Sequence, residues 1–274
     1  MPASIEQATG ASNDDRAVVA QRRDSALWLR LNRPQALNAI TPETVRLINA
    51  ALDEAEGDDS LRAVILTGTG KAFCAGADLR YIRAEIGDDR AAMSAFLNSV
   101  LDMMLRLERF PRPVIAAING TAVAGGLELV LCCDLVIAAR SAKIGDGHGN
   151  FGLLPGGGAT ARLPRKVGVT FAKYMLFTAE LLPAEKLVAP GLVNEVVDDD
   201  SLEAAATALA SKLASKSPLV LRRVKALVDD GLEQPLATAL RLELLAGEVH
   251  ANSHDMQEGI AAFDEKRPPK FTGR

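Results

Sequence analysis

One glutamate and one histidine have the side chains and the surroundings that proton-transfer chemistry needs. Glu128 lies within GGLELVLCCD, a stretch that is almost wholly apolar. A carboxylate buried there without a partner is costly, and its pKa rises. His148 lies between two glycines in IGDGHGNFGLLPGGG, residues 144–158. Because a histidine titrates near neutral pH, this side chain can give or take a proton in that range.

Each of these residues also has a simpler interpretation. On a short helix, Glu128 can bond to the free N–H groups of that helix's own first turn, as in a capping box. His148 can be a neutral residue that shapes a pocket, or an exposed loop histidine. Asp146 is expected to be a turn residue, because aspartate beside glycine is ordinary turn chemistry. The other histidines, His250 and His254, are expected to face solvent.

Two glycine-bearing segments precede this loop, GKAFCAGADL (residues 70–79) and NGTAVAGGLEL (residues 119–129). Neither they nor the loop contain GxGxxG between a strand and a helix, or a P-loop, so the motifs of a nucleotide-binding Rossmann fold are missing. Both segments read as a strand, a glycine and the start of a helix. Such a turn exposes backbone N–H groups at a positive helix end. Two such ends aimed at one point would form an oxyanion hole.

These residues must be positioned by alternating strands and helices. The segment AVVAQRRDSALWLRLNRP predicts two short strands joined at Arg23-Asp24. A helix is predicted from Pro42, with Thr41 as its N-cap, and a longer amphipathic helix over residues 88–110. AVILTG, VIAAING and LVIAA predict buried strands. Because this alternation ends near residue 200 and helices follow, we predict an α/β fold with a helical C-terminal segment.

Composition sets the limits of this interpretation. With 274 residues, 48% of them hydrophobic, the chain can bury a large core. Its net charge of −4 argues against a nucleic-acid partner. No apolar run reaches the length of a membrane span. Residues 1–15 are small and polar and predict a flexible extension. The three cysteines, without a CxxC pair, predict reduced, buried thiols in the cytoplasm and no metal site.

Five segments occur in an order that is typical of one family: LNRPQALNAIT, GKAFCAGADL, INGTAVAGGLELVLCCDLVIAA, FGLLPGGGATARLPRKVG and APGLVNEVV. Over nearly its whole length the chain resembles the enoyl-CoA hydratase/isomerase (crotonase) superfamily. The resemblance implies a spiral core of ββα units over residues 16–200 and a helical segment over residues 201–274. It also implies an acyl-CoA thioester as substrate, no cofactor beyond the CoA of that substrate, and a homotrimer or a dimer of trimers.

The resemblance assigns roles to individual residues. The backbone N–H groups of Ala77 and Gly125 would hold the thioester oxygen as it becomes an enolate, and Glu128 would be a catalytic acid or base. The residues that would contact the CoA ester are Gln35, Ala36, Leu37, Ala75, Asp78, Leu79, Arg80 and Lys266. Ala36 stands where many members have lysine, so one phosphate contact is expected to be missing. Lys266 would reach the CoA phosphates of its own or a neighbouring subunit.

His148 marks a departure from the family pattern. It occupies the place where hydratases carry a second glutamate, so the acid-base pair becomes Glu128 and His148. Hydration of a 2-enoyl-CoA is the leading hypothesis. Isomerisation of the double bond by a single base is the next. Ring-opening C–C hydrolysis and a non-catalytic acyl-CoA-binding relic are the remaining alternatives.

Overall fold

The structure is a computed structural model that describes residues 16–274, so the predicted extension of residues 1–15 lies outside the described part. The strands form a six-stranded sheet in the order β1-β2-β3-β5-β7-β10 and a four-stranded sheet in the order β4-β6-β8-β9. The strands are β1 (Val18–Arg23), β2 (Ala26–Leu31), β3 (Ala63–Gly68), β4 (Ala72–Cys74), β5 (Val114–Ile118), β6 (Thr121–Val123), β7 (Leu135–Ala139), β8 (Lys143–Gly145), β9 (Leu182–Pro183) and β10 (Glu195–Val197).

The two sheets are built by a repeated unit. Strands β3, β5 and β7 lie in the six-stranded sheet, and the strand that follows each of them, β4, β6 or β8, lies in the four-stranded sheet. A helical segment then returns the chain to the next unit. This alternation confirms the predicted α/β spiral of ββα units and excludes a single doubly wound sheet.

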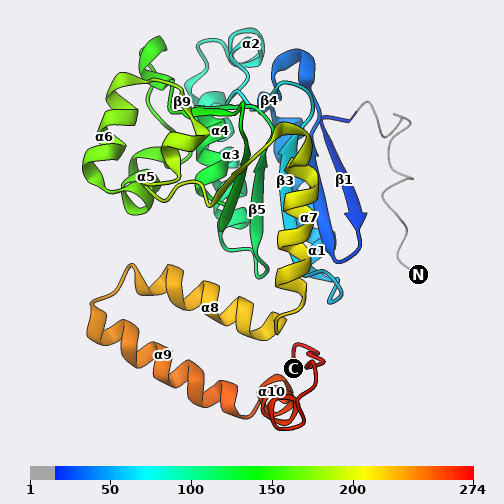
Figure 1. Cartoon of the computed structure of the whole chain (residues 1–274). Helices are drawn as coiled ribbons and strands as arrows, with labels where there is room; N and C mark the ends of the chain where they lie inside the picture. Colours follow the sequence, from blue (N-terminus) through cyan, green and yellow to red (C-terminus); the bar gives the residue numbers. More distant parts are fainter. Residues whose placement is uncertain (1–15) are drawn as a thin grey trace.

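Helices surround the sheets and form the end of the chain (Figure 1). They are α1 (Pro42–Glu56), α2 (Leu79–Tyr81), α3 (Arg90–Glu108), α4 (Gly125–Leu131), α5 (Ala159–Val167), α6 (Val169–Thr178), α7 (Leu202–Ala214), α8 (Pro218–Gly231), α9 (Leu236–Ala251) and α10 (His254–Asp264). Short 3₁₀ turns occupy Pro34–Ala36, His148–Phe151, Ala184–Leu187 and Asp199–Ser201, and a π-helical turn occupies Ile82–Ile86.

The predicted helix α1 begins as the sequence indicates. The Thr41 hydroxyl accepts a hydrogen bond from the Thr44 N–H, and Pro42 stands in the first turn, where a missing N–H costs nothing. The predicted hairpin is also present, but its turn is displaced by one residue. Arg23 still pairs with Ala26, so the turn is Asp24-Ser25, with Asp24 at φ 51°.

The core lies between the six-stranded sheet and its helices. Every residue of β3 and β5 is buried, as expected for central parallel strands that are covered on both faces. Helix α7 packs against β3, β5 and β7, and α1 packs against β1 and β2. The four-stranded sheet carries α4, which contacts β4 and β6.

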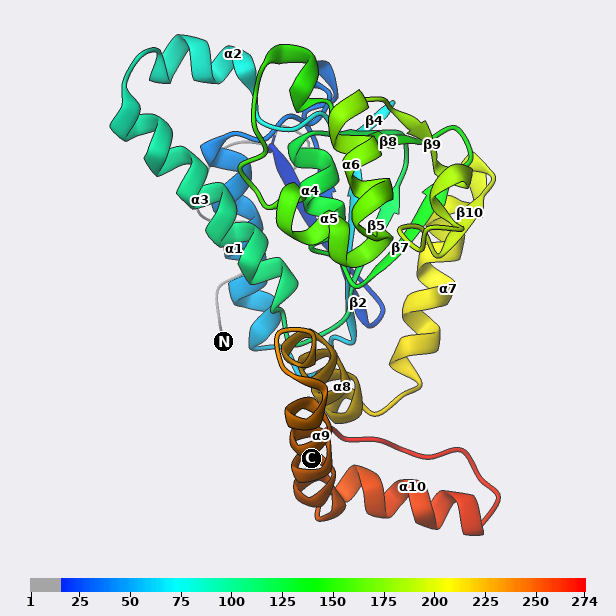
Figure 2. The same ribbon diagram turned by 90° about the vertical axis from the view of Figure 1, so that its left-hand side faces the viewer.

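Helices α8, α9 and α10 project from this core as a separate arm (Figure 2). Helix α9 packs against α8 but has no fully buried residue, so most of its apolar side chains stay exposed within residues 16–274. The exposed large hydrophobic residues of the arm are Val224, Val228, Leu232, Leu236, Leu240, Leu242, Leu244, Leu245, Val249, Met256, Ile260 and Phe263. An exposed apolar surface of this extent is typical of a surface that binds a partner, and the expected oligomer stays a prediction.

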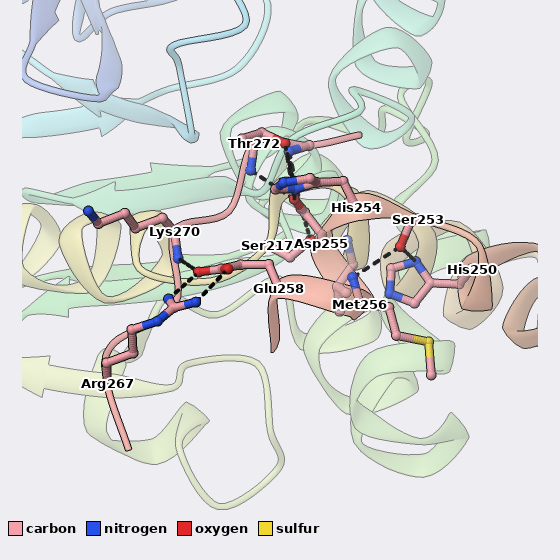
Figure 3. A network of polar contacts seen from close by, with 12 residues as sticks. Ser217, His250, Ser253, His254, Asp255, Met256, Glu258, Arg267, Lys270 and Thr272 are labelled. Atoms are coloured by element: carbon pink, nitrogen blue, oxygen red, sulfur yellow. Dashed lines mark hydrogen bonds and ion pairs between the residues drawn. The ribbon is translucent and has the colours of Figure 1, made fainter. Parts of the chain in front are cut away.

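The end of the chain is fastened to the arm by two carboxylates (Figure 3). Asp255 is buried, and it accepts hydrogen bonds from the Ser217 hydroxyl at 2.5 Å and the Thr272 N–H at 2.8 Å. Glu258 forms a bidentate ion pair with Arg267 at 2.6 and 2.9 Å. Bidentate pairs of this kind fix geometry as well as charge, so the last residues are held against α10.

The two histidines of the arm differ in exposure. The side chain of His254 is 56% exposed, as predicted. The prediction for His250 was wrong, because His250 is half-buried, and its Nδ1 lies 2.7 Å from Arg223 Nη1 and 3.3 Å from Ser253 Oγ. Packing of α8 against α9 brings Arg223 to this histidine, which the sequence spacing does not reveal.

Candidate active site

Three neighbouring parallel strands end at one edge of the four-stranded sheet. β4 pairs in parallel with β6, and β6 with β8, so their carboxyl ends lie side by side. The segments that follow these strands are residues 75–77, 124–125 and 146–148. They contain both predicted oxyanion donors and His148. Side chains that follow the carboxyl ends of parallel strands commonly form the binding site of an α/β protein.

The backbone N–H groups of Ala77 and Gly125 are adjacent and available. Within residues 16–274 neither of them donates a hydrogen bond. A Cβ added to Gly125 would lie 3.5 Å from the Ala77 nitrogen. Gly76 makes this approach possible, since it has φ +88° and a Cβ there would lie 2.9 Å from the Gly125 nitrogen. Two free donors this close together are what an oxyanion hole requires, although their convergence on a single oxygen stays a prediction.

The residue before Gly125 has a strained backbone. Ala124 adopts φ 54° and ψ −120°, a region that residues with a Cβ rarely populate. Conformations of this kind cost about 1–3 kcal/mol and persist where the surrounding structure enforces them. Here the Ala124 N–H donates to the Gly145 carbonyl of β8 at 3.3 Å, which ties the turn to the strand before His148.

Glu128 lies one helical turn after Gly125 and is 3% exposed. It does not cap its own helix, as the simpler interpretation supposed. Its Oε1 accepts hydrogen bonds from Gly157 N at 2.7 Å and Ala159 N at 3.1 Å, at the start of α5. Burial raises the pKa of Glu128, and these two N–H groups and the charge of His148 only partly oppose that rise. Oε2 accepts no hydrogen bond from the described residues.

His148 is held by Asp146. Nδ1 of His148 lies 2.9 Å from Asp146 Oδ1, and the His148 N–H donates to Asp146 Oδ2 at 3.2 Å. Burial lowers the pKa of His148, but the hydrogen bond and charge of Asp146, together with the charge of Glu128, outweigh it and raise the pKa above 6.5. Nε2 has no partner within residues 16–274, so it is the nitrogen that can serve a substrate.

Asp146 contacts His148 more closely than the sequence interpretation expected. It is 1% exposed, and its carboxylate both accepts the His148 N–H, as expected of an aspartate in a turn, and lies against the His148 ring, which the turn interpretation did not anticipate. The sequence feature that could have predicted this contact is the position of Asp146 two residues before His148. A carboxylate at that spacing can reach the ring when the backbone turns sharply, and Gly147 between them has φ +70°.

The expected CoA-binding segments are brought together beside the oxyanion donors. The Ala75 N–H donates to the Leu37 carbonyl at 3.0 Å, and the Asp78 N–H donates to the Ile40 carbonyl at 2.9 Å. Leu37 has φ 51°, at the end of the 3₁₀ turn that contains Gln35 and Ala36. The turn and the start of α2 therefore form one surface.

Three of the residues expected to contact the CoA ester differ in exposure and in the hydrogen bonds of their side chains. Leu79 and Arg80 are exposed beside the turn. Asp78 is 8% exposed, and its carboxylate accepts the Arg80 and Tyr81 N–H groups and pairs with Arg33 at 2.9 Å. Its side chain is thus occupied in starting α2. Contact of these residues with an acyl-CoA stays a prediction.

Lys266 is not part of this cluster in its own chain. It follows α10, at the end of the arm opposite to α2, as both views show (Figures 1 and 2). Contact of Lys266 with a CoA ester, in a neighbouring subunit, therefore stays a prediction.

The thiols and carboxylates form no further site among the described residues. Cys74, Cys132 and Cys133 are unpaired and buried, as predicted. Burial raises the pKa of Cys74 to about 12, which leaves its thiol protonated. Within residues 16–274 no group of three or more His, Cys, Asp or Glu side chains has the arrangement of a metal site, and no helix is long and apolar enough to span a bilayer.

Comparisons with known proteins show the family of the chain. The family described as enoyl-CoA hydratase/isomerase matches residues 21–274. The crotonyl-CoA hydratase of Syntrophomonas wolfei is 34% identical over 94% of this chain and 98% of its own. The short-chain-enoyl-CoA hydratase of Clostridium acetobutylicum is 35% identical over 91% of this chain and 95% of its own. The crystal structure of an enoyl-CoA hydratase from Bacillus anthracis superimposes with a TM-score of 0.90 at 36% identity, covering 94% of this chain and all of the other. The chain belongs to the enoyl-CoA hydratase/isomerase family.

Proposed function

We propose that the protein hydrates the double bond of a 2-enoyl-CoA with Glu128 and His148 as its acid-base pair. The observation that carries the proposal is the shared edge of β4, β6 and β8, where two free N–H groups and the Asp146–His148 pair emerge together. The charges of Glu128 and His148 shift each other's pKa, which supports their working on one substrate.

The reaction follows from these positions. Glu128 takes a proton from a water whose oxygen bonds to the β-carbon, and the electron pair of the double bond moves toward the thioester. The N–H groups of Ala77 and Gly125 stabilise the negative charge on the thioester oxygen. His148 then donates the Nε2 proton to the α-carbon. Because its pKa is raised, His148 keeps this proton to higher pH than an ordinary histidine. Proton transfer from Glu128 to His148 restores the resting pair.

The CoA ester is proposed to lie over the surface formed by Gln35, Ala36 and Leu37 with Ala75–Arg80, with Lys266 of a neighbouring subunit near the phosphates. The exposed arm supports a trimer or a dimer of trimers. Three reduced thiols support a cytoplasmic setting. No cofactor is required beyond the CoA of the substrate.

Turnover of crotonyl-CoA, followed by loss of the enoyl-thioester absorbance, tests the proposal. Glu128→Gln should abolish it. A panel of branched and cyclic enoyl-CoAs, with products identified by mass spectrometry, separates the alternatives. A product heavier by one water supports hydration, an isomeric product supports Glu128 acting alone, and a cleaved carbon–carbon bond supports the hydrolase alternative. Tight binding of CoA esters without any product would favour a binding relic.

A further inference from the structure

The hydrogen bonds that orient Glu128 come from a turn without side chains. The turn consists of Gly156, Gly157 and Gly158, and α5 begins directly after it. Oε1 of Glu128 accepts the Gly157 N–H and the Ala159 N–H. A run of three glycines has high conformational freedom, so contacts from outside must hold it in one conformation.

Arg162 supplies such a contact from the other side of Gly157. Its Nη1 donates to the Gly157 carbonyl at 2.6 Å. Gly157 is therefore bound through both of its backbone groups, the N–H to Glu128 and the carbonyl to Arg162. The guanidinium lies directly over Gly158, which has φ +103°, because a Cβ at that position would be 2.1 Å from Nη1.

Glu108 fixes the guanidinium in place. Arg162 Nε and Nη2 donate to the two carboxylate oxygens of Glu108 at 2.8 and 2.7 Å. The Arg162 side chain is 12% exposed, so this bidentate pair is shielded from solvent on the arginine side. Glu108 is the last residue of α3, a helix that is distant in sequence. A planar fork of this kind holds an arginine in one orientation.

We propose that Arg162, held by Glu108, is a positioning residue that keeps the Glu128 carboxylate oriented through the backbone of Gly157. The inference rests on the proposed role of Glu128 in proton transfer. Electrostatics supports the same arrangement. The Glu108 hydrogen bond is the largest cause that raises the pKa of Arg162, and the charge of Glu128 contributes to that rise. We therefore expect that removing the guanidinium makes the Glu128 carboxyl harder to ionise.

Arg162→Gln and Glu108→Gln test the proposal. We expect Arg162→Gln to lower kcat by about 10–100-fold, a loss of the size seen when a partner that orients a metal ligand is removed. KM for crotonyl-CoA should stay unchanged, because the guanidinium is bonded to Gly157 and Glu108 and is not one of the predicted substrate contacts. The acid limb of the kcat profile should move to higher pH. Arg162→Lys should recover part of the loss, and Glu108→Gln should show a smaller loss of the same kind.

Arg165→Gln is the matched control, because Arg165 lies one turn further along α5 with its side chain 54% exposed. Thermal unfolding of each variant separates misfolding from mispositioning. Carbon-13 NMR of labelled glutamate, with Glu128→Gln for assignment, reads the Glu128 titration without turnover. A folded Arg162→Gln variant with unchanged kcat and unchanged Glu128 titration would overturn the proposal. A wild-type protein that turns over no enoyl-CoA would overturn the proposed function instead, while the Glu128 titration still decides the role of Arg162.

Discussion

Asp146 Oδ1 lies 2.9 Å from His148 Nδ1, and both side chains are largely buried. This contact holds the imidazole ring so that Nε2 is its free nitrogen. Asp146→Asn removes the charge that raises the pKa of His148, while burial, which lowers that pKa, remains. The protonated ring is the proposed acid, so kcat declines as the ring loses its proton with rising pH. In the variant this alkaline decline should begin at a lower pH than in the wild type. The kcat profile and the NMR titration of His148 check this. Asp88→Asn, on an exposed loop, is the control, and an unshifted alkaline limb would contradict the role of Asp146.

His148 itself should be needed for the chemical step. His148→Ala is expected to lower kcat by roughly 10²–10⁴, the usual contribution of one positioned acid or base. Binding of CoA esters, measured by calorimetry, should be nearly intact. His148→Glu would create a pair of carboxylates and should favour simple enoyl-CoA hydration. His254→Ala, at an exposed histidine, serves as the control. Unchanged turnover in His148→Ala would show that this residue only shapes the loop.

Two glycines with positive φ should respond differently to substitution by alanine if the proposed oxyanion hole is present. Only the one beside the hole should lose catalytic activity. In Gly76→Ala the new Cβ would lie 2.9 Å from the Gly125 nitrogen, so one donor must move. Loss of one oxyanion donor costs about 10²–10³ in kcat. Gly87→Ala is the matched control, because Gly87 has φ +54° but nothing within 4 Å of the added Cβ. Both variants carry backbone strain, and only Gly76→Ala should lose activity beyond its loss of stability. Equal activities of the two variants would argue against the donor pair.

The arm predicts an oligomer in solution. Leu236, Leu240 and Leu244 recur every fourth residue on α9 and are 75%, 56% and 64% exposed, so they lie on one face. We expect the wild type to sediment as a trimer or hexamer. Leu240→Glu with Leu244→Glu should shift it to a monomer, because charges on an apolar interface are costly to bury. Glu243→Gln, on the same helix, should leave the assembly unchanged. A wild-type monomer at micromolar concentration would contradict the prediction.

The Asp255 carboxylate should control how firmly the last residues are held. Burial raises the pKa of Asp255, but the Ser217 hydroxyl and the N–H groups of Thr272 and Gly273 outweigh it and lower the pKa below 3.8. A group whose pKa is lower in the folded state stabilises the fold above its unfolded pKa, and this contribution is lost as pH falls through the folded value.

Asp255→Asn should therefore loosen residues 272–274, at a cost of about 1.5–3 kcal/mol for hydrogen bonds to a charged group, while Glu258 still accepts the Lys270 N–H. Hydrogen exchange of the Thr272 and Gly273 N–H groups measures the change. Asp264→Asn, at the exposed end of the same helix, should have no effect. Equal protection in Asp255→Asn and wild type at neutral pH would refute this role.

Much of the fold could be predicted from local features of the sequence. The apolar runs AVILTG and VIAAI specify buried central strands, and Thr41 with Pro42 specifies where α1 begins, since these signals act within a few residues. Glu128 and His148 stood out for the same reason, because each is a titratable group in a local setting that does not suit it. The order of the five family-like segments along the chain then indicated the family, and the family resemblance implied the spiral of ββα units.

Tertiary structure decided the partners of those residues. Glu128 bonds to N–H groups that lie 29 and 31 residues further along the chain, and Arg162 reaches Glu108 across 54 residues. No local pattern encodes such a contact. It depends on how α5 and α3 are placed relative to the strand edge formed by β4, β6 and β8. Tertiary structure also placed α10, which precedes Lys266, at the end of the molecule away from α2 (Figures 1 and 2). The sequence alone therefore determined which residues can carry protons, whereas only packing determined which dipoles and charges hold them.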